Sequence, residues 1–223
     1  ALLCLVCSVF RLGAQDGFLA KPGKHKVKLP FQLINNLVII PVSVNGVELR
    51  FLLDTGVDET ILFSLEDKEV KLYEVEKLKL KGLGNQEGVE GLRSKNNTLS
   101  IGGLSYHNQE VYLVIDEKMN LSSSLGVPVN GIIGYHLFAD NVIKLDYAAR
   151  KVVLYNTAKV DLQKLSRGYT AFDISLERNK PYLNARVNAG KNEINAKLLL
   201  DTGNSDAIWL FDQQSDQIDI PQK

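Results

Sequence analysis

The sequence has little cysteine, no excess of charge and few histidines. Its two cysteines, Cys4 and Cys7, both lie near the N-terminus. Lysine plus arginine and aspartate plus glutamate number 26 each, so the formal net charge is zero and no electrostatic attraction to nucleic acid is expected. The three histidines, at 25, 107 and 136, lack the spacing of metal ligands. We therefore expect no metal, no other cofactor and no nucleic-acid partner.

Long hydrophobic runs are also missing. The first ten residues are largely apolar, but a membrane-spanning helix needs about 20 such residues. Small residues around Ala14 resemble a signal-peptidase site, so we expect residues 1–14 to be part of a signal peptide that starts further upstream. The alternative is a disordered or buried N-terminal segment. A signal peptide predicts a secreted or periplasmic protein whose mature chain has no cysteine, which excludes disulfides and thiol chemistry.

Strand patterns dominate the rest of the chain. Apolar runs rich in β-branched residues at 37–44 and 47–53 flank Asn45-Gly46, a pair typical of hairpin turns. A short helix is expected at 135–139, a polar serine-rich loop at 119–128, and either a strand or a short helix within 64–80. The predicted fold class is therefore mainly β. Further strands are expected at 99–101, 111–115, 142–145 and 151–155.

The sequence contains an internal repeat. A turn glycine, an apolar strand and Asp-Thr-Gly at 46–56 recur at 190–203, with three more residues between the turn glycine and the aspartate. Each copy follows another apolar strand and leads into further apolar residues. A recurrence with the same order of features indicates duplication. The distance between the two aspartates leaves room for one complete small β lobe.

The repeated Asp-Thr-Gly suggests a chemical role for Asp54 and Asp201. One copy alone is an ordinary turn at the end of a strand, because Asp and Gly are common turn formers. A plain turn, however, does not require the threonine and the same apolar flanks twice. If the two loops meet, the two carboxylates share a proton and titrate as a pair. The ionised member can take a proton from water while the protonated member donates to a carbonyl oxygen, which is general acid–base hydrolysis of an amide.

Residues 51–63 and 198–211 resemble the active-site loops of retropepsin-like and pepsin-like aspartic proteases. In this family two apolar residues and a glycine pass beneath each Asp-Thr-Gly loop, and Ile132-Ile133-Gly134 matches that element. The resemblance implies closed β-barrel lobes, one complete and one truncated. It is greatest to bacterial exported proteins with two tandem retropepsin-like lobes, in which a peptide-binding PDZ domain often follows. We therefore expect a first lobe at 24–160 and the start of a second, truncated lobe at 168–223.

The resemblance also assigns roles to residues. It implies an aspartic-type endopeptidase that acts on a peptide or protein substrate without metal or cofactor. The glycine-rich stretch 82–91 lies where the family has its flexible flap. The implied catalytic pair is Asp54 and Asp201; the supporting residues are Thr55, Gly56, Thr202, Gly203, Ile132, Ile133 and Gly134; the flap glycines are Gly82, Gly84 and Gly88.

Two departures from the family pattern keep alternatives open. Val57 and Asn204 follow the motifs where the family usually has Ala, Ser or Thr. A first alternative is therefore a catalytically weak or inactive peptide-binding protein of the same fold. A second alternative, which follows from the expectation of one complete lobe, is a homodimer in which that lobe pairs with the lobe of another copy. Asp58 and Glu59, next to the first motif, are interpreted as a solvated turn, with modulation of the aspartate pair as the alternative.

Overall fold

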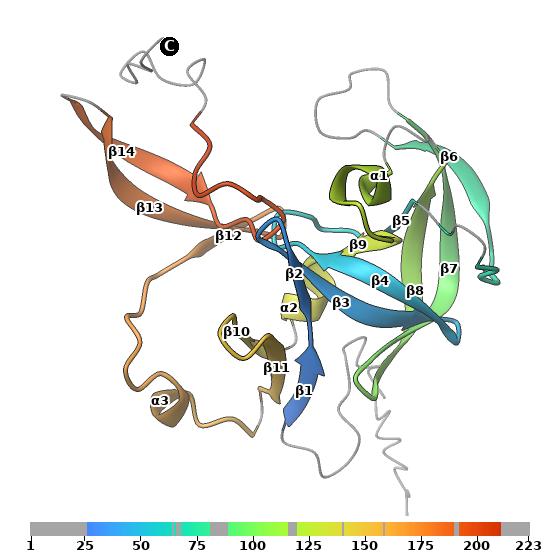
Figure 1. Cartoon of the computed structure of the whole chain (residues 1–223), viewed down its shortest axis with the longest axis horizontal. Coiled ribbons are helices and arrows are strands. Elements are labelled where there is room, and N and C mark those ends of the chain that lie inside the picture. The colour runs from blue at the N-terminus through green and yellow to red at the C-terminus, as the bar shows by residue number, and fades with distance from the viewer. Residues whose placement is uncertain are drawn as a thin grey trace, which may run out of the picture.

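The computed structural model describes residues 26–63, 65, 68–80, 89–115, 120–139, 141–157, 159–189 and 192–210. The predicted signal segment 1–14 and the predicted flap glycines Gly82, Gly84 and Gly88 lie outside these described residues. The described chain is mainly β, which confirms the predicted fold class (Figure 1). None of the described helices is long and apolar enough to cross a membrane. The two predicted lobe boundaries stay predictions.

The largest sheet has eight strands, six of which close into a barrel. Their order is β2-β3-β4-β9-β5-β8-β7-β6, and β3 also pairs with β7 through Ser43↔Ser100 and Val44↔Leu99. This second pairing joins the two ends of a six-strand ring, so the barrel has a continuous wall. The strands are β2 (Gln32–Ile34), β3 (Leu37–Val44), β4 (Val47–Leu53), β5 (Ile61–Leu62), β6 (Glu76–Leu80), β7 (Val89–Ile101), β8 (Leu104–Val114) and β9 (Gly131–Ile133).

The first hairpin, β3–β4, supplies much of the barrel core. Asn45 and Gly46 have φ values of +50° and +90°, the backbone that a two-residue hairpin turn requires. Alternate residues of the two strands point inward, as the period of a half-buried strand dictates. These side chains are fully buried: Ile40, Val42, Val44, Leu49, Phe51 and Leu53.

A three-stranded sheet covers one end of this core. Strand β1 (Lys26–Pro30) pairs with β11 (Lys151–Asn156), which pairs with β10 (Asn141–Asp146). Val27, Leu29, Val152 and Leu154 from these strands join the same hydrophobic cluster as the barrel residues. Gly102 lies against Leu29 so closely that an added Cβ would be 2.1 Å from a Leu29 methyl carbon. The chain before the barrel and the chain after it therefore fold as one unit.

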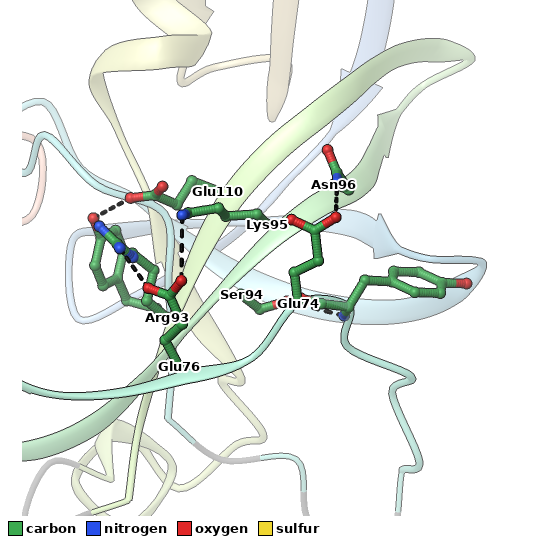
Figure 2. Close-up of polar contacts among 9 residues, drawn as sticks. Glu74, Glu76, Arg93, Ser94, Lys95, Asn96 and Glu110 are labelled. Carbon is green, nitrogen blue, oxygen red and sulfur yellow. Dashed lines mark hydrogen bonds and ion pairs between the residues drawn. The ribbon is translucent and has the colours of Figure 1, made fainter.

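The outer surface of β6 and β7 carries charged side chains that pair across the strands. Figure 2 shows the Glu76 carboxylate between Arg93 and Lys95, at 2.5 and 3.5 Å, and Glu74 beside Asn96. The Glu76 side chain is 53% exposed, and exposed ion pairs contribute little to stability. We interpret this cluster as a solvated face of the sheet.

Helix α2 (Tyr135–Ala139) and the predicted strands are confirmed, but two expectations need revision. The expected loop at 119–128 contains a short helix, α1 (Leu121–Leu125), because Asn120 caps its start and Gly126, at φ +70°, ends it. Of the two alternatives for 64–80, strand β6 confirms the strand. Gly91, expected in the flexible flap, belongs to strand β7 and pairs with Leu78 and Val114.

A separate ribbon follows the barrel. Helix α3 (Leu162–Leu165) lies in the connection to strands β12 (Ser175–Glu177), β13 (Lys180–Ala189) and β14 (Asn192–Leu199), which form their own antiparallel sheet. In Figure 1 this orange ribbon projects away from the barrel. Much of its apolar surface is exposed: Leu176 and Leu200 are 60% and 46% exposed. The ribbon is therefore far less enclosed than the equivalent β3–β4 hairpin.

Candidate active site

The first Asp-Thr-Gly loop is held from beneath by strand β9. This strand runs parallel to β4 and antiparallel to β5, so Ile132 and Ile133 pass between the two arms of the loop. The Asp54 N–H donates to the Ile133 carbonyl oxygen at 3.0 Å. A Cβ added to Gly134 would lie 2.1 Å from the Val57 carbonyl oxygen and 2.4 Å from that of Asp54. Glycine is therefore the residue that this close approach of backbones requires.

Each aspartate is oriented by the glycine of its own motif. The Gly56 N–H donates to Asp54 Oδ1 at 2.7 Å, and the Gly203 N–H donates to Asp201 Oδ1 at 2.8 Å. Backbone N–H donors favour the ionised form of a carboxylate. The two copies of the motif thus have the same local geometry, although their surroundings differ.

Two threonines bind the loops to each other reciprocally. The Thr55 N–H donates to Thr202 Oγ1 at 3.1 Å, and the Thr202 N–H donates to Thr55 Oγ1 at 3.0 Å. Each hydroxyl donates in turn across the junction, from Thr55 to the Leu200 carbonyl at 2.6 Å and from Thr202 to the Leu53 carbonyl at 2.8 Å. Four hydrogen bonds with two-fold symmetry therefore fix one loop against the other. Each bond uses one of the two hydroxyls, so valine, which is isosteric with threonine, would remove two of the four at either position and all four at both.

The four hydrogen bonds bring the two carboxylates together. A Cβ added to Gly56 would lie 3.1 Å from both Asp201 Cγ and Asp54 Oδ1. A Cβ added to Gly203 would lie 2.2 Å from Asp54 Oδ2. Both motif glycines are thus needed for space, because any larger residue would displace a carboxylate. The structure places Asp54, Thr55, Gly56, Asp201, Thr202 and Gly203 in one site, with Ile132, Ile133 and Gly134 beneath its first loop.

The environment of Asp54 favours its protonated form. Its pKa is raised from 3.8 to about 7, first by burial and second by the negative charge of Asp201. The Gly56 N–H and the positive charge of Lys180 oppose this rise. Near neutral pH Asp54 can therefore hold a proton next to Asp201. Such a pair presents a proton donor and a proton acceptor side by side.

The second loop is more open than the first. Asp54 is only 8% exposed, whereas Asp201, Thr202 and Gly203 are half-buried. Among the described residues, no strand lies beneath the second loop as β9 lies beneath the first. The loop is followed by exposed apolar residues, with Ile208 and Trp209 at 48% and 61%. Asn204, which follows the motif, accepts a hydrogen bond from the Asp206 N–H at 2.9 Å.

Two asparagines also join the loops, and the sequence did not single them out. The Asn179 side-chain amide donates to both oxygens of the Asp58 carboxylate, at 3.0 and 3.2 Å. The Asn36 side-chain amide donates to the Ser205 carbonyl at 3.0 Å. Asp58 is half-buried and partnered, so the interpretation as a purely solvated turn is wrong for this residue. A signal was present, because a short strand and a turn with asparagine precede the apolar strand in both copies.

Within the part of the chain that the structure describes, no cluster of three or more His, Cys, Asp or Glu side chains could hold a metal ion. The site contains two carboxylates, each of which accepts a hydrogen bond from a backbone N–H. That set of groups is suited to moving protons.

Comparison with known proteins finds a family match and similar solved structures. Residues 40–137 match the family model described as aspartyl protease. The matched range contains the first Asp-Thr-Gly loop and Ile132-Ile133-Gly134 and ends before the second loop. The chain is also similar to the crystal structure of a retropepsin-like aspartic protease from Rickettsia conorii, with 15% identity and a TM-score of 0.42 over 59% of this chain and 90% of that one. No curated protein matches the chain. The family match supports a function of the aspartic protease type.

Proposed function

We propose that this protein is an aspartic peptidase that hydrolyses peptide bonds between Asp54 and Asp201. The observation that carries the proposal is the reciprocal threonine bonding, with distances of 2.6 to 3.1 Å, which holds the two motif loops together. The family match over residues 40–137 supports the same assignment. The substrate class is a peptide or protein.

In the proposed reaction Asp201 takes a proton from water while protonated Asp54 donates to the peptide carbonyl oxygen. This assignment of roles follows from burial, because the pKa of Asp54 is raised to about 7 and its proton is retained near neutral pH. Water attacks the carbonyl carbon, its proton passes to Asp201, and the carbonyl oxygen receives the proton of Asp54. The tetrahedral intermediate then collapses as Asp201 gives its proton to the amine that leaves and Asp54 takes a proton back from a hydroxyl of the intermediate. No covalent bond to the protein is formed.

We also propose that the protein is exported, because a largely apolar run and a signal-peptidase-like site occupy residues 1–14. Fusion of this segment to a reporter enzyme that is active only after export, together with cell fractionation, would test this directly. A PDZ domain after the second lobe and pairing with another copy stay predictions of the resemblance.

The catalytic proposal is tested with Asp54→Asn and Asp201→Asn. Each variant keeps the size of the side chain and removes the ability to exchange a proton, so we expect loss of peptide cleavage with an unchanged circular dichroism spectrum. Cleavage of a peptide library would be followed by mass spectrometry in the presence of a chelator and of reagents that block serine and cysteine nucleophiles. Full activity in either variant would contradict the proposal.

A second candidate function is peptide binding without hydrolysis. It is favoured by the open second loop, in which Asp201 is half-buried, and by Val57 and Asn204 after the motifs. A peptide that binds the wild-type chain, remains intact over acidic to neutral pH and is bound equally well by Asp54→Asn would support this alternative. Cleavage of the bound peptide would exclude it.

A further inference from the structure

Two tight turns outside the motifs have the same conformation and the same kind of contact. Asn35 and Asn36, between β2 and β3, have φ values of +48° and +65°. Arg178 and Asn179, between β12 and β13, have φ values of +48° and +62°. In each turn the second residue is an asparagine whose side-chain amide reaches the opposite motif loop. The strands on both sides also pair in the same register.

The residues that these asparagines contact are equivalent as well. Asp58 lies four residues after Asp54, and Ser205 lies four residues after Asp201. The two contacts therefore lie on either side of the threonine junction and follow the same two-fold relation. They differ in chemistry: Asn179 donates to a half-buried carboxylate, whereas Asn36 donates to an exposed backbone carbonyl. A hydrogen bond to a charged acceptor is the stronger kind.

Asn179 is connected to Asp201 through a short backbone path. Two residues after Asn179, the Pro181 carbonyl accepts from the Leu200 N–H at 2.9 Å, and Leu200 directly precedes Asp201. The Leu200 carbonyl accepts from the Thr55 hydroxyl at 2.6 Å. On the barrel side, the Val57 carbonyl next to Asp58 accepts from the Tyr135 N–H at 3.0 Å. A shift at residue 179 would therefore move Asp201 relative to a loop that is anchored to helix α2.

We propose that Asn179 and Asp58 are positioning residues that hold the Asp201 loop against the Asp54 loop, and that Asn36 and Ser205 form a weaker counterpart. The consequence for hydrolysis rests on the proposed function, but the effect on the two carboxylates does not. Because the second loop has no strand beneath it among the described residues, its alignment depends on contacts of this kind more than that of the first loop does.

The test uses glycine substitutions, because glycine keeps the left-handed turn while it removes the side-chain amide. Asn179→Gly removes the contact with Asp58, and Arg178→Gly is the matched control at the neighbouring left-handed position. Asn36→Gly and Asn35→Gly form the same pair in the first turn. Circular dichroism and thermal unfolding of all four variants establish that the turns still form.

The first readout is the carboxyl titration of Asp54 by carbon-13 NMR, which does not require any peptidase activity. In Asn179→Gly we expect the Asp54 midpoint to fall by about one pH unit, since Asp201 moves away and its charge no longer opposes ionisation. Asp58→Ala should give the same shift, and combining it with Asn179→Gly should give no further shift. Asp58→Asn keeps an acceptor oxygen for Asn179, so its Asp54 midpoint should stay close to that of the wild type. Asn36→Gly should give a smaller shift.

The second readout is steady-state hydrolysis of a cleaved peptide. Misalignment of the two carboxylates should lower kcat by about tenfold in Asn179→Gly and leave KM within about twofold. A wild-type Asp54 titration in Asn179→Gly, or the same shift in Arg178→Gly, would overturn the inference. If no peptide is cleaved, the proposed function fails while the titration still decides the role of Asn179. If peptides are cleaved and the titration is unchanged, the function stands and the positioning role falls.

Discussion

The two Asp-Thr-Gly loops have nearly the same internal geometry and very different surroundings. Each glycine N–H binds its aspartate, at 2.7 Å in the first loop and 2.8 Å in the second, and each threonine makes the same two contacts. The first loop, however, is buried and is supported by strand β9 of the barrel, whereas the second follows a ribbon that projects from the barrel (Figure 1). The comparison separates what the motif itself determines from what its surroundings determine.

The motif determines the approach of the two loops, and burial raises the pKa of Asp54. Desolvation is the largest cause of the raised pKa of Asp54, ahead of the charge of Asp201. Desolvation depends on β9 and the barrel core, which have no equivalent around the second loop among the described residues. The same motif thus stands in two different surroundings, and those of the first loop favour the protonated form of Asp54.

The largest effect is expected from truncation of the leucine that precedes each aspartate. Leu53 is fully buried and Leu200 is 46% exposed, although they occupy equivalent positions of the repeat. Leu53→Ala should lower the free energy of unfolding by about 2–5 kcal/mol, the range for leucine truncation in a core, whereas Leu200→Ala should lower it by less than about 1 kcal/mol. Urea unfolding followed by circular dichroism measures both. Equal losses would show that the second loop is enclosed to the same degree as the first.

The second prediction concerns pH. Because the pKa of Asp54 is raised from 3.8 to about 7, the folded state binds more protons than the unfolded state between these values. Stability contributed by protonated Asp54 is therefore fully present below about pH 4 and is lost as the pH rises to about 7, with a slope of at most about 1.4 kcal/mol per pH unit. Asp54→Asn should remove this part of the pH dependence. The unfolding free energy of Asp54→Asn minus that of the wild type, measured by urea unfolding from pH 4 to 8, should therefore increase with pH.

A difference that is flat over this range would contradict the raised pKa of Asp54. Asp58→Asn is a suitable control, because it removes a carboxylate from the same loop and keeps an acceptor oxygen for Asn179. It should keep the pH dependence attributed to Asp54.

The sequence predicted the central part of this site and missed its periphery. The repeated Asp-Thr-Gly with apolar flanks marked Asp54 and Asp201 as a candidate pair at equivalent strand ends, and the resemblance to aspartic proteases implied that the two loops meet. Asn36 and Asn179 were missed, since asparagine at a left-handed turn position is explained by the backbone alone. Helix α1 was missed because five residues are too few to show a helical period, and only the cap at Asn120 marks its start.

The unequal burial of the two loops was also beyond the sequence. Leu53 and Leu200 have the same type and the same neighbours in their repeats, so local pattern gives them equal burial. Their exposure differs because β9 and the barrel strands, which are distant in sequence, cover only the first. Apolar pattern shows which side chains can be buried, whereas the tertiary contacts decide which are.

The smallest effect is expected from substitution of Lys180, a residue of the ribbon whose positive charge acts on Asp54 in the first loop. Its half-buried side chain lies next to Asn179, and its positive charge lowers the pKa of Asp54. Lys180→Gln should therefore raise the Asp54 midpoint above about 7 by a fraction of a pH unit, since a neutral side chain no longer favours the carboxylate. Carbon-13 NMR titration measures the shift. Lys197→Gln, in the same ribbon but bonded to Glu177, is the matched control and should leave the midpoint unchanged. An equal shift in both variants would mean that Asp54 responds to the total charge of the ribbon, and the comparison of the two loops would then have to include long-range charge as well as burial.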